Sequence, residues 1–222
     1  MTRICLLMWY DAAISEYADI NYKINKHYCD KYGITIIHSN TKTYIDRHPA
    51  WERIPLMLKY INDYDYVIWI DADAFFYIDS PNILEIINQT PDVPIIFSRD
   101  HFRDNDNEVN SGFIIVKNHE YSIRFLLEWG YNEDLYKNNS KPIWWDQGVL
   151  LDMQRNNVLD IQNNRVCHEY GVLQHIYDYD LCHFKQKPYI WHSAGESKER
   201  RIFISSNYFH ENQSILEAYL QD

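Results

Sequence analysis

The chain has 222 residues, of which 46% are hydrophobic and 24% charged, a composition typical of one globular domain with a sizeable core. Only 6 glycines and 7 prolines are present, which excludes collagen-like and disordered sequences. The formal net charge of −11 argues against nucleic acid as a partner, because binding to phosphates requires a basic surface. Aromatic residues make up 16% of the chain and are typical both of protein cores and of sites for sugars and bases.

In the first hundred residues, apolar stretches of strand length alternate with longer stretches of helical spacing. Strands are expected at residues 3–9, 34–38, 66–70 and 94–98. Helices are expected at residues 12–32, ending at Gly33, at 51–61, with a bend or restart at Pro55, and from Ser80-Pro81 onward. This alternation of strands and helices predicts a parallel sheet with right-handed crossovers.

The second half of the chain has a less regular pattern. A polar loop at residues 100–110 precedes a short strand at 112–116. Helices are expected at 119–130, 144–156 and 214–220, with scattered strand-like pieces over 158–189. We find no internal repeat and no linker, and therefore expect a single α/β domain over residues 1–222.

The segments that would indicate a membrane or a metal-binding cysteine cluster are missing from the sequence. The longest apolar run near the N-terminus covers residues 4–10, too short for a signal peptide or a membrane span. We therefore expect a cytoplasmic protein with no transmembrane segment in this chain, unless the chain is a fragment of a larger membrane-anchored protein. No CxxC spacing occurs, so we expect buried free thiols at Cys5, Cys29, Cys167 and Cys182.

The most informative segment is the expected strand at residues 66–70, which Asp71-Ala72-Asp73 follows directly. Open α/β sheets bind ligands at the carboxyl ends of their parallel strands. Residues i and i+2 of an extended chain point to the same side, so Asp71 and Asp73 can address one cation. Carboxylate oxygens in this number suit Mg²⁺ or Mn²⁺ bound jointly with phosphates. The competing interpretation is a pair of acids that caps the following turn.

Four further segments occur in order and with compatible spacing around this DxD sequence. They are residues 51–55 (WERIP), 110–118 (NSGFIIVKN), 145–148 (WDQG) and 192–198 (HSAGESK). Together they resemble the nucleotide-sugar glycosyltransferases of the GT-A fold. The matches are similar to its retaining branch, which includes the galactosyltransferase/glycogenin and the xyloglucan xylosyltransferase/mannan galactosyltransferase families. The resemblance implies a Rossmann-like domain with a mixed, mainly parallel sheet, whose nucleotide-binding half covers about 1–100 and whose acceptor and catalytic half covers about 101–222.

The resemblance also implies roles for individual residues. Asp71, Asp73 and His192 would bind Mn²⁺ or Mg²⁺. A mixed carboxylate and imidazole set favours Mn²⁺ somewhat over Mg²⁺. Gly195 would let the backbone approach a diphosphate and Lys198 would place a charge on it, which stabilises the leaving group. The full set of expected donor-binding residues is Met8, Trp9, Tyr10, Arg53, Ala72, Asp100, Asn110, Gly195 and Lys198.

Gln147 and Asp146 are the expected catalytic residues. In the resembled enzymes this element lies on the face of the anomeric carbon opposite the leaving group, where the carbonyl dipole of Gln147 would stabilise an oxocarbenium-like centre. A covalent or general-base role for Asp146 is the alternative. Trp144 and Trp145 precede this element, and we expect either an acceptor platform or core packing there.

The expected function is metal-dependent transfer of a sugar from a nucleoside-diphosphate sugar, with a UDP-sugar as the expected donor, to a glycan or other hydroxyl acceptor, with retention of anomeric configuration. Two alternatives stay open. One is a phosphohydrolase similar to the haloacid dehalogenases, although Phe75 stands where that family usually has Thr or Val. The other is a module that binds nucleotide sugars without turnover.

Overall fold

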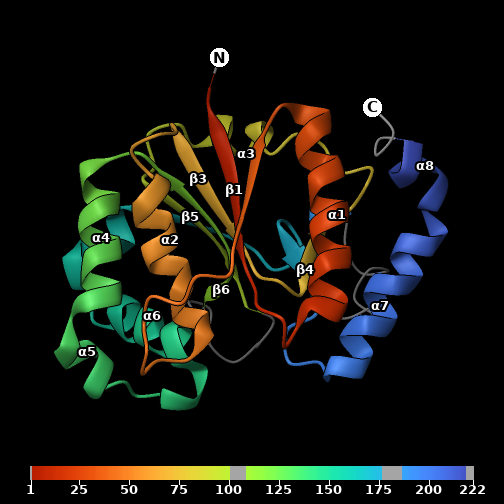
Figure 1. Ribbon diagram of the computed structural model, residues 1–222. Coiled ribbons are helices and arrows are strands. Elements are labelled where there is room, and N and C mark those ends of the chain that lie inside the picture. Colours follow the sequence, from red (N-terminus) through yellow and green to blue (C-terminus); the bar gives the residue numbers. More distant parts are fainter. Residues whose placement is uncertain (1, 101–108, 177–186, 219–222) are drawn as a thin grey trace.

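A central β-sheet is enclosed by helices on both faces in the computed structural model, which describes residues 2–100, 109–176 and 187–218 (Figure 1). Most of the polar loop expected at residues 100–110 lies outside these ranges. So do Cys182, part of the 158–189 region and the end of the expected terminal helix.

Six strands form the central sheet: β1 (Ile4–Trp9), β2 (Thr35–Ser39), β3 (Tyr66–Ile70), β5 (Ile95–Arg99), β6 (Val109–Lys117) and β7 (Arg165–His168). Their spatial order is β2-β1-β3-β6-β5-β7. β2, β1 and β3 are mutually parallel, and β7 is parallel to β5. β6 is antiparallel to both of its neighbours, β3 and β5. The expected mixed, mainly parallel sheet is therefore confirmed.

The helices divide between the two faces of this sheet (Figure 1). α1 (Ser15–Tyr32) and α3 (Leu84–Gln89) cover one face, while α2 (Arg53–Tyr60), α4 (Glu120–Tyr131) and α6 (Trp145–Arg155) cover the other. Along β1, Leu6 and Met8 join the core under α1, and Leu7 and Trp9 join the opposite core. All six residues of β1 are buried, which explains why the strand is apolar throughout.

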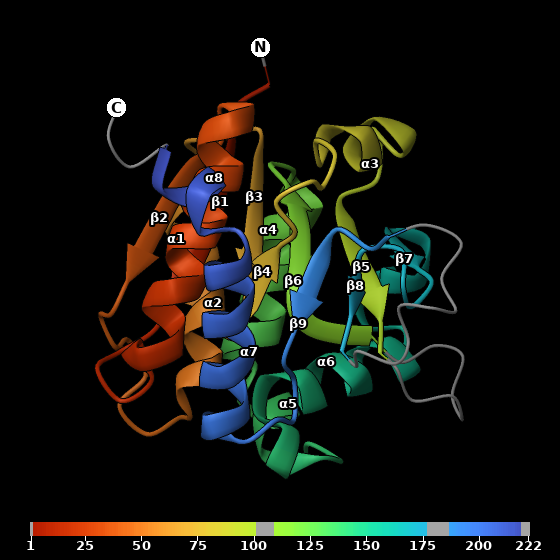
Figure 2. The same cartoon turned by 90° about the vertical axis from the view of Figure 1, so that its right-hand side faces the viewer.

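A second sheet of three short strands was not expected from the sequence. It consists of β4 (Ala74–Phe76), β8 (Gln174–His175) and β9 (Ile190–His192), with β9 in the middle. β4 and β9 are antiparallel and pair Ala74 with His192 (Figure 2). This pairing brings the end of β9 beside the segment that follows β3.

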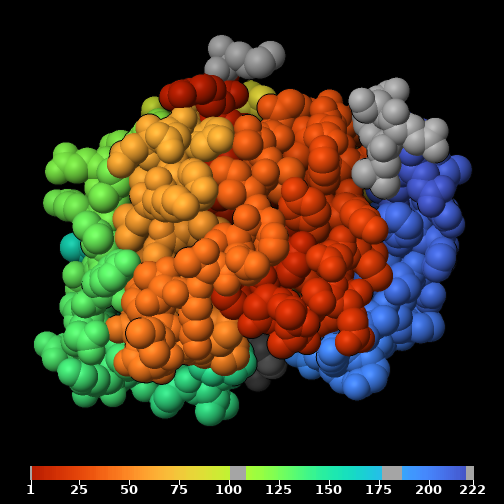
Figure 3. Space-filling view, in the orientation of Figure 1, coloured from red at the N-terminus to blue at the C-terminus, as the bar shows by residue number. Residues whose placement is uncertain are grey.

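A helix that the sequence did not predict, α7 (Lys198–Glu211), packs along α1, as the space-filling view shows from one side (Figure 3). Only Ser205 is fully buried among its residues, while Ile202, Ile204, Tyr208 and Phe209 pack partly buried against the cores, so the apolar face of the helix is short and mixed with polar residues. The side chain of Ser197 accepts a hydrogen bond from the Arg200 N–H at 3.2 Å and thereby caps the helix. α8 (Gln213–Ala218) follows, close to the expected terminal helix.

Other element boundaries differ from expectation in small ways. The short helix α3 begins at Leu84, because the Ser80 hydroxyl donates to the Tyr189 carbonyl at 2.7 Å and does not cap a helix. α1 ends where expected, at Gly33 with a φ of 66°. The remaining short helices are η1 (Pro49–Glu52), α5 (Glu133–Lys137), η2 (Pro142–Trp144) and η3 (Val158–Asn163).

The cysteines in the described ranges carry free thiols. Cys5 and Cys29 are buried, as expected, and Cys167 is half-buried. Within those ranges, no helix combines the length and the apolar character that crossing a lipid bilayer requires.

Candidate active site

The carboxyl end of β3 delivers two acids into the site. The Asp71 N–H donates to the Gly112 carbonyl at 2.8 Å, which continues the pairing of β3 with β6 by one residue. The chain then turns, and the Ala74 N–H donates to the Asp71 carbonyl at 3.0 Å. Asp73 lies inside this turn, so its carboxylate is held near that of Asp71.

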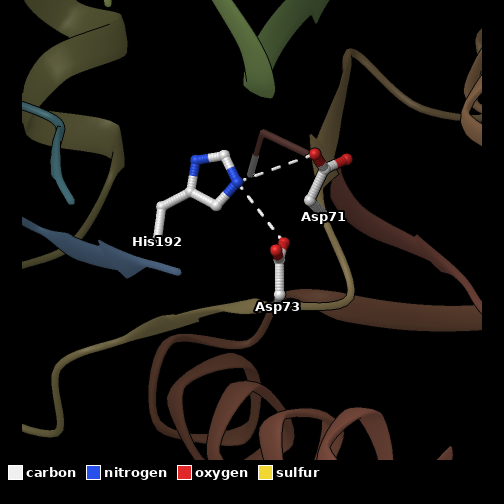
Figure 4. A group of neighbouring side chains, drawn as sticks. All are labelled: Asp71, Asp73 and His192. Carbon is white, nitrogen blue, oxygen red and sulfur yellow. Dashed lines mark ion pairs between the residues drawn. The ribbon is translucent and has the colours of Figure 1, made fainter. Parts of the chain in front are cut away.

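His192 at the end of β9 completes a three-residue cluster (Figure 4). Its Nε2 lies 3.4 Å from an Asp73 oxygen and 3.7 Å from an Asp71 oxygen. One ligand atom from each residue lies within 4.8 Å of the other two. The second ring nitrogen, Nδ1, is 3.1 Å from Oε1 of Gln174, a contact that requires the proton on Nδ1 and leaves Nε2 to face the acids. Such a carboxylate and imidazole set, with a partner that fixes the tautomer, fits a divalent cation.

The acids and the histidine also shift one another's protonation. Burial opposes ionisation of Asp73, but the charges of His192 and Arg201 outweigh it and lower the Asp73 pKa to about 2. Burial disfavours the charged ring of His192, yet Asp73 and Asp71 raise its pKa above the ordinary value. The cluster therefore attracts positive charge strongly, and a bound cation would take the place of the imidazole proton.

Arg53, at the start of α2, connects this cluster to the next group of residues. Its guanidinium lies 3.1 Å from Asp71 and 3.0 Å from Asp146. It also donates hydrogen bonds to the carbonyls of Ser111 and, through Nε, of Ala50. The Arg53 side chain is only 4% exposed and is fully engaged with protein atoms, so it positions the two acids.

Asp146 in the first turn of α6 is a buried carboxyl with an unusual pKa. Burial raises this pKa to about 7 against the opposing charge of Arg53, and Asp71 adds to the rise. The Arg53 Nε atom lies next to Oδ2 of Asp146 but donates its hydrogen to the Ala50 carbonyl. The Oδ2 atom of Asp146 therefore accepts no hydrogen bond within the described residues. A carboxyl of this kind can exchange a proton near neutral pH.

Gln147 is held rigidly beside Asp146. Its Oε1 accepts hydrogen bonds from the Ser111 N–H at 3.0 Å and from the Ser111 hydroxyl at 3.1 Å. Its Nε2 donates to Asp100 at 3.2 Å. Asp100 in turn lies 3.5 Å from the side-chain amide of Asn110. These contacts fix the amide plane of Gln147 and join the ends of β5, β6 and α6 into one polar wall.

A cavity of about 450 Å³ opens onto these groups. Eleven of the residues expected at the site line it: Trp9, Arg53, Asp71, Ala72, Asp73, Asp100, Asn110, Asp146, Gln147, His192 and Gly195. A polar wall and a three-ligand cluster around one cavity can hold a metal-bound, phosphorylated ligand in a fixed orientation.

Three of the expected donor-binding residues lie elsewhere. Met8 is fully buried in the core and Tyr10 is buried with its ring stacked on His38 at 3.8 Å, so neither lines the cavity. The Lys198 ammonium lies 2.8 Å from Glu16 on α1, and Lys198 is not among the lining residues either.

Several lining or supporting residues were missed by sequence reasoning. Arg201 on α7 contacts Asp73 at 2.9 Å, and Gln174 on β8 orients His192. Arg201 follows the 192–198 segment by about one helical turn. This position was the only feature of the sequence that could have indicated a role for Arg201 in the site. Gln174 belongs to a two-residue strand with no readable pattern. His48, which was also missed, lines the cavity and stacks on the ring of Trp145, a residue that was expected there, with ring centroids 3.6 Å apart.

Comparison with known proteins gives the family. The family model for nucleotide-diphospho-sugar transferases matches residues 34–208. A glycosyltransferase involved in glycosylation of the major capsid of PBCV-1 superposes with a TM-score of 0.73 and 14% identity, covering 92% of this chain and 99% of that chain. No curated protein sequence matches the chain significantly.

Two further solved structures share this architecture. The galactosyltransferase LgtC, in complex with donor and acceptor sugar analogues, has a TM-score of 0.59 and 11% identity over 91% of this chain and 95% of its own. GlyE from Streptococcus pneumoniae has a TM-score of 0.60 and 15% identity over 100% of this chain and 64% of its own. At these identities the neighbours show the fold, whereas the family model spans most of the chain and shows the family. The chain belongs to the nucleotide-diphospho-sugar transferase family and is a glycosyltransferase of the GT-A fold.

Proposed function

We propose that this glycosyltransferase transfers a sugar from a nucleoside-diphosphate sugar, in the first instance a UDP-sugar, to a hydroxyl of a glycan, in a metal-dependent reaction that retains anomeric configuration. The observation that carries the proposal is the cluster of Asp71, Asp73 and His192, which opens into a 450 Å³ cavity beside Gln147. This volume lies within the range of pockets that bind small-molecule ligands and cofactors in proteins.

In this proposal Asp71, Asp73 and His192 hold Mn²⁺ or Mg²⁺, with Mn²⁺ favoured by the imidazole. When bound, the cation supplies positive charge that stabilises the departing diphosphate. Gln174 holds His192 in the tautomer that presents Nε2, and Arg53 holds Asp71 in place. The remaining lining residues from the expected set contact the donor: Trp9, Ala72, Asp100, Asn110 and Gly195.

Retention is supported by what surrounds Gln147. An active-site glutamine is the residue altered in a solved variant of LgtC. Here the Gln147 oxygen accepts two hydrogen bonds from Ser111, so the amide is a fixed dipole and a poor nucleophile. We propose front-face substitution, in which the acceptor oxygen bonds to the anomeric carbon as the bond to the diphosphate oxygen breaks. The acceptor proton passes to that departing oxygen, and Asp146 with its pKa of about 7 is the alternative base.

The acceptor side of the cavity is apolar and exposed. Trp145 is 45% exposed and Ile143 is 77% exposed, and both line the cavity mouth. His48 covers one face of the Trp145 ring, which leaves the other face for a sugar ring. Trp144 also lines the cavity but packs against the core cluster under α4 and α6, so we assign the platform to Trp145 and a packing role to Trp144.

The test is a thermal-shift screen of UDP- and GDP-sugars with and without Mn²⁺. The right donor at a hundredfold excess over its dissociation constant should add about 2.7 kcal/mol to the free energy of unfolding, and only with the metal. A screen in which no nucleotide sugar shifts the transition contradicts the proposal. For the matching donor, NMR of the product then gives the anomeric configuration, and an inverted product rejects retention. Donor binding without any transfer or hydrolysis would instead favour a non-catalytic module.

A further inference from the structure

The charged side chains near the cluster do not all face the cavity, and this decides which of them can reach a diphosphate. Among the described residues, two basic side chains besides the histidines line the cavity, those of Arg53 and Arg201. Arg53 is 4% exposed and bound to two carboxylates and two carbonyls. A side chain so fully engaged holds other residues in place and has little capacity left for a ligand.

Arg201 has a different environment. Its guanidinium contacts Asp73 at 2.9 Å and the Ser193 carbonyl at 3.3 Å, and it lies 5.7 Å from the centre of the Tyr17 ring. The side chain is 25% exposed and faces the cavity. Asp73 uses its other oxygen toward His192, so a cation on that side leaves the Arg201 contact in place.

Lys198, the lysine of the 192–198 segment, lies on the same helix three residues earlier. Its ammonium pairs with Glu16 at 2.8 Å, its side chain is 43% exposed, and the residue does not line the cavity. The helix therefore presents Arg201 to the cavity and Lys198 to the surface of α1.

We infer that Arg201, rather than Lys198, is the basic residue of α7 that binds the diphosphate of the donor. This inference rests on the proposed function, and it makes Arg201 a ligand-contacting residue. A planar guanidinium next to Asp73 can donate two hydrogen bonds to phosphate oxygens, which a lysine ammonium does as a point charge only. Ser193 and Tyr17 hold the guanidinium in that position before the ligand arrives.

The experiment is calorimetric titration of UDP and of uridine, in Mn²⁺, into the wild-type protein and into the variants R201Q and K198Q. Removing a charged hydrogen-bond partner costs about 10- to 100-fold in affinity. We expect R201Q to lose that much affinity for UDP and to keep its affinity for uridine, which has no phosphate. K198Q should bind both ligands within about twofold of wild type, because a surface ion pair contributes little.

A separate measurement distinguishes ligand contact from a structural role. Binding of Mn²⁺ alone, followed by electron paramagnetic resonance, should be as tight in R201Q as in wild type or tighter, because the variant removes a positive charge beside Asp73. Loss of Mn²⁺ binding in R201Q would instead make Arg201 a support for Asp73 and overturn the inference. Loss of UDP affinity in K198Q but not in R201Q would also overturn it. If wild type itself binds neither UDP nor GDP with Mn²⁺, the proposed function fails, and this inference fails with it.

Discussion

Gly112 on β6 lies directly against the ring of His192, so that a Cβ atom at position 112 would come within 2.8 Å of both ring nitrogens. The absence of a side chain at one strand position thus makes room for the ring of His192, the residue from a different sheet that we propose as a metal ligand. The segment that resembles glycosyltransferases at residues 110–118 contains this glycine, and the contact gives a physical reason for it.

We therefore expect G112A to displace His192 and to abolish the thermal shift that Mn²⁺ produces. G33A is the matched control, because Gly33 has a φ of 66° and does not line the cavity, and no heavy atom lies within 4 Å of the position that a Cβ would occupy. G33A should lose about 1 to 2 kcal/mol of stability through backbone strain and retain its full response to Mn²⁺. A normal Mn²⁺ response in G112A would show that His192 does not need this space.

Gln174 should matter for metal binding although it does not touch the metal in our proposal. Loss of the Nδ1 partner in Q174L frees the His192 ring and should weaken Mn²⁺ binding about 10- to 100-fold. Q154L is the control, since Gln154 is a buried glutamine on α6 whose side-chain atoms have no hydrogen-bond partner in the described part of the chain. Equal Mn²⁺ affinities in Q174L and wild type, measured by calorimetry, would refute this supporting role.

Metal affinity should depend on pH through His192. The acids raise the pKa of its imidazole, so a proton competes with the cation up to a higher pH than for a free histidine. Apparent Mn²⁺ affinity should therefore fall as pH decreases, starting at a higher pH than the titration of a free histidine, by up to about tenfold per pH unit once the ring is protonated. Calorimetry in buffers of different ionisation enthalpy should detect proton release on binding, and affinity that is independent of pH would contradict the assignment.

Asp146 gives a prediction about stability. Its pKa in the folded protein, about 7, is above that of an aspartate in the unfolded chain, so the folded state holds the proton more tightly. The carboxyl therefore favours folding at low pH, and this contribution is lost as pH rises from about 4 to about 7. Urea unfolding of wild type and D146N should show the wild type losing stability relative to the variant over this range, by up to about 1.4 kcal/mol per pH unit. A relative gain with pH would mean that Arg53 keeps Asp146 ionised.

Gln147 should affect catalysis more than binding. Q147A removes the contacts with Ser111 and Asp100, and we expect it to lower the transfer rate about 100-fold while donor affinity changes severalfold at most. Q162A is the control, because Gln162 is exposed on η3 away from the cavity. A parallel loss of rate and donor affinity in Q147A, from steady-state kinetics and calorimetry, would reassign Gln147 to donor binding.

Much of the fold could be predicted because buried strands leave a continuous apolar sequence. β3 occupies the expected residues, Tyr66–Ile70, and the acids that follow it lie in one turn. α7 was missed because its apolar side chains, Ile202, Ile204, Tyr208 and Phe209, form only a short and partly buried face around Ser205. β9 was missed because a three-residue strand carries no periodicity, and its pairing with β4 joins segments far apart in the chain.

Within the site, residue types could be predicted better than side-chain directions. Trp9 lines the cavity while its neighbours Met8 and Tyr10 face the core, a difference that the pleat of β1 decides. Likewise, the rotation of α7 against α1 determines that Arg201 faces the cavity and Lys198 does not. Such side-chain directions depend on how helices and strands pack against one another. A motif within one segment of the sequence does not contain that information.

The central claim is that Asp71, Asp73 and His192 hold the cation through which the donor binds. The most direct test is calorimetric titration of the UDP-sugar that the thermal-shift screen identifies. It is titrated into wild type and into D73N, each with Mn²⁺ and with EDTA. D79N is the control, because Asp79 is an exposed acid paired with Lys187 on the surface. We predict binding to wild type and D79N only in Mn²⁺, and a loss of at least about 100-fold in D73N. Unchanged Mn²⁺-dependent binding of the donor to D73N would contradict the claim.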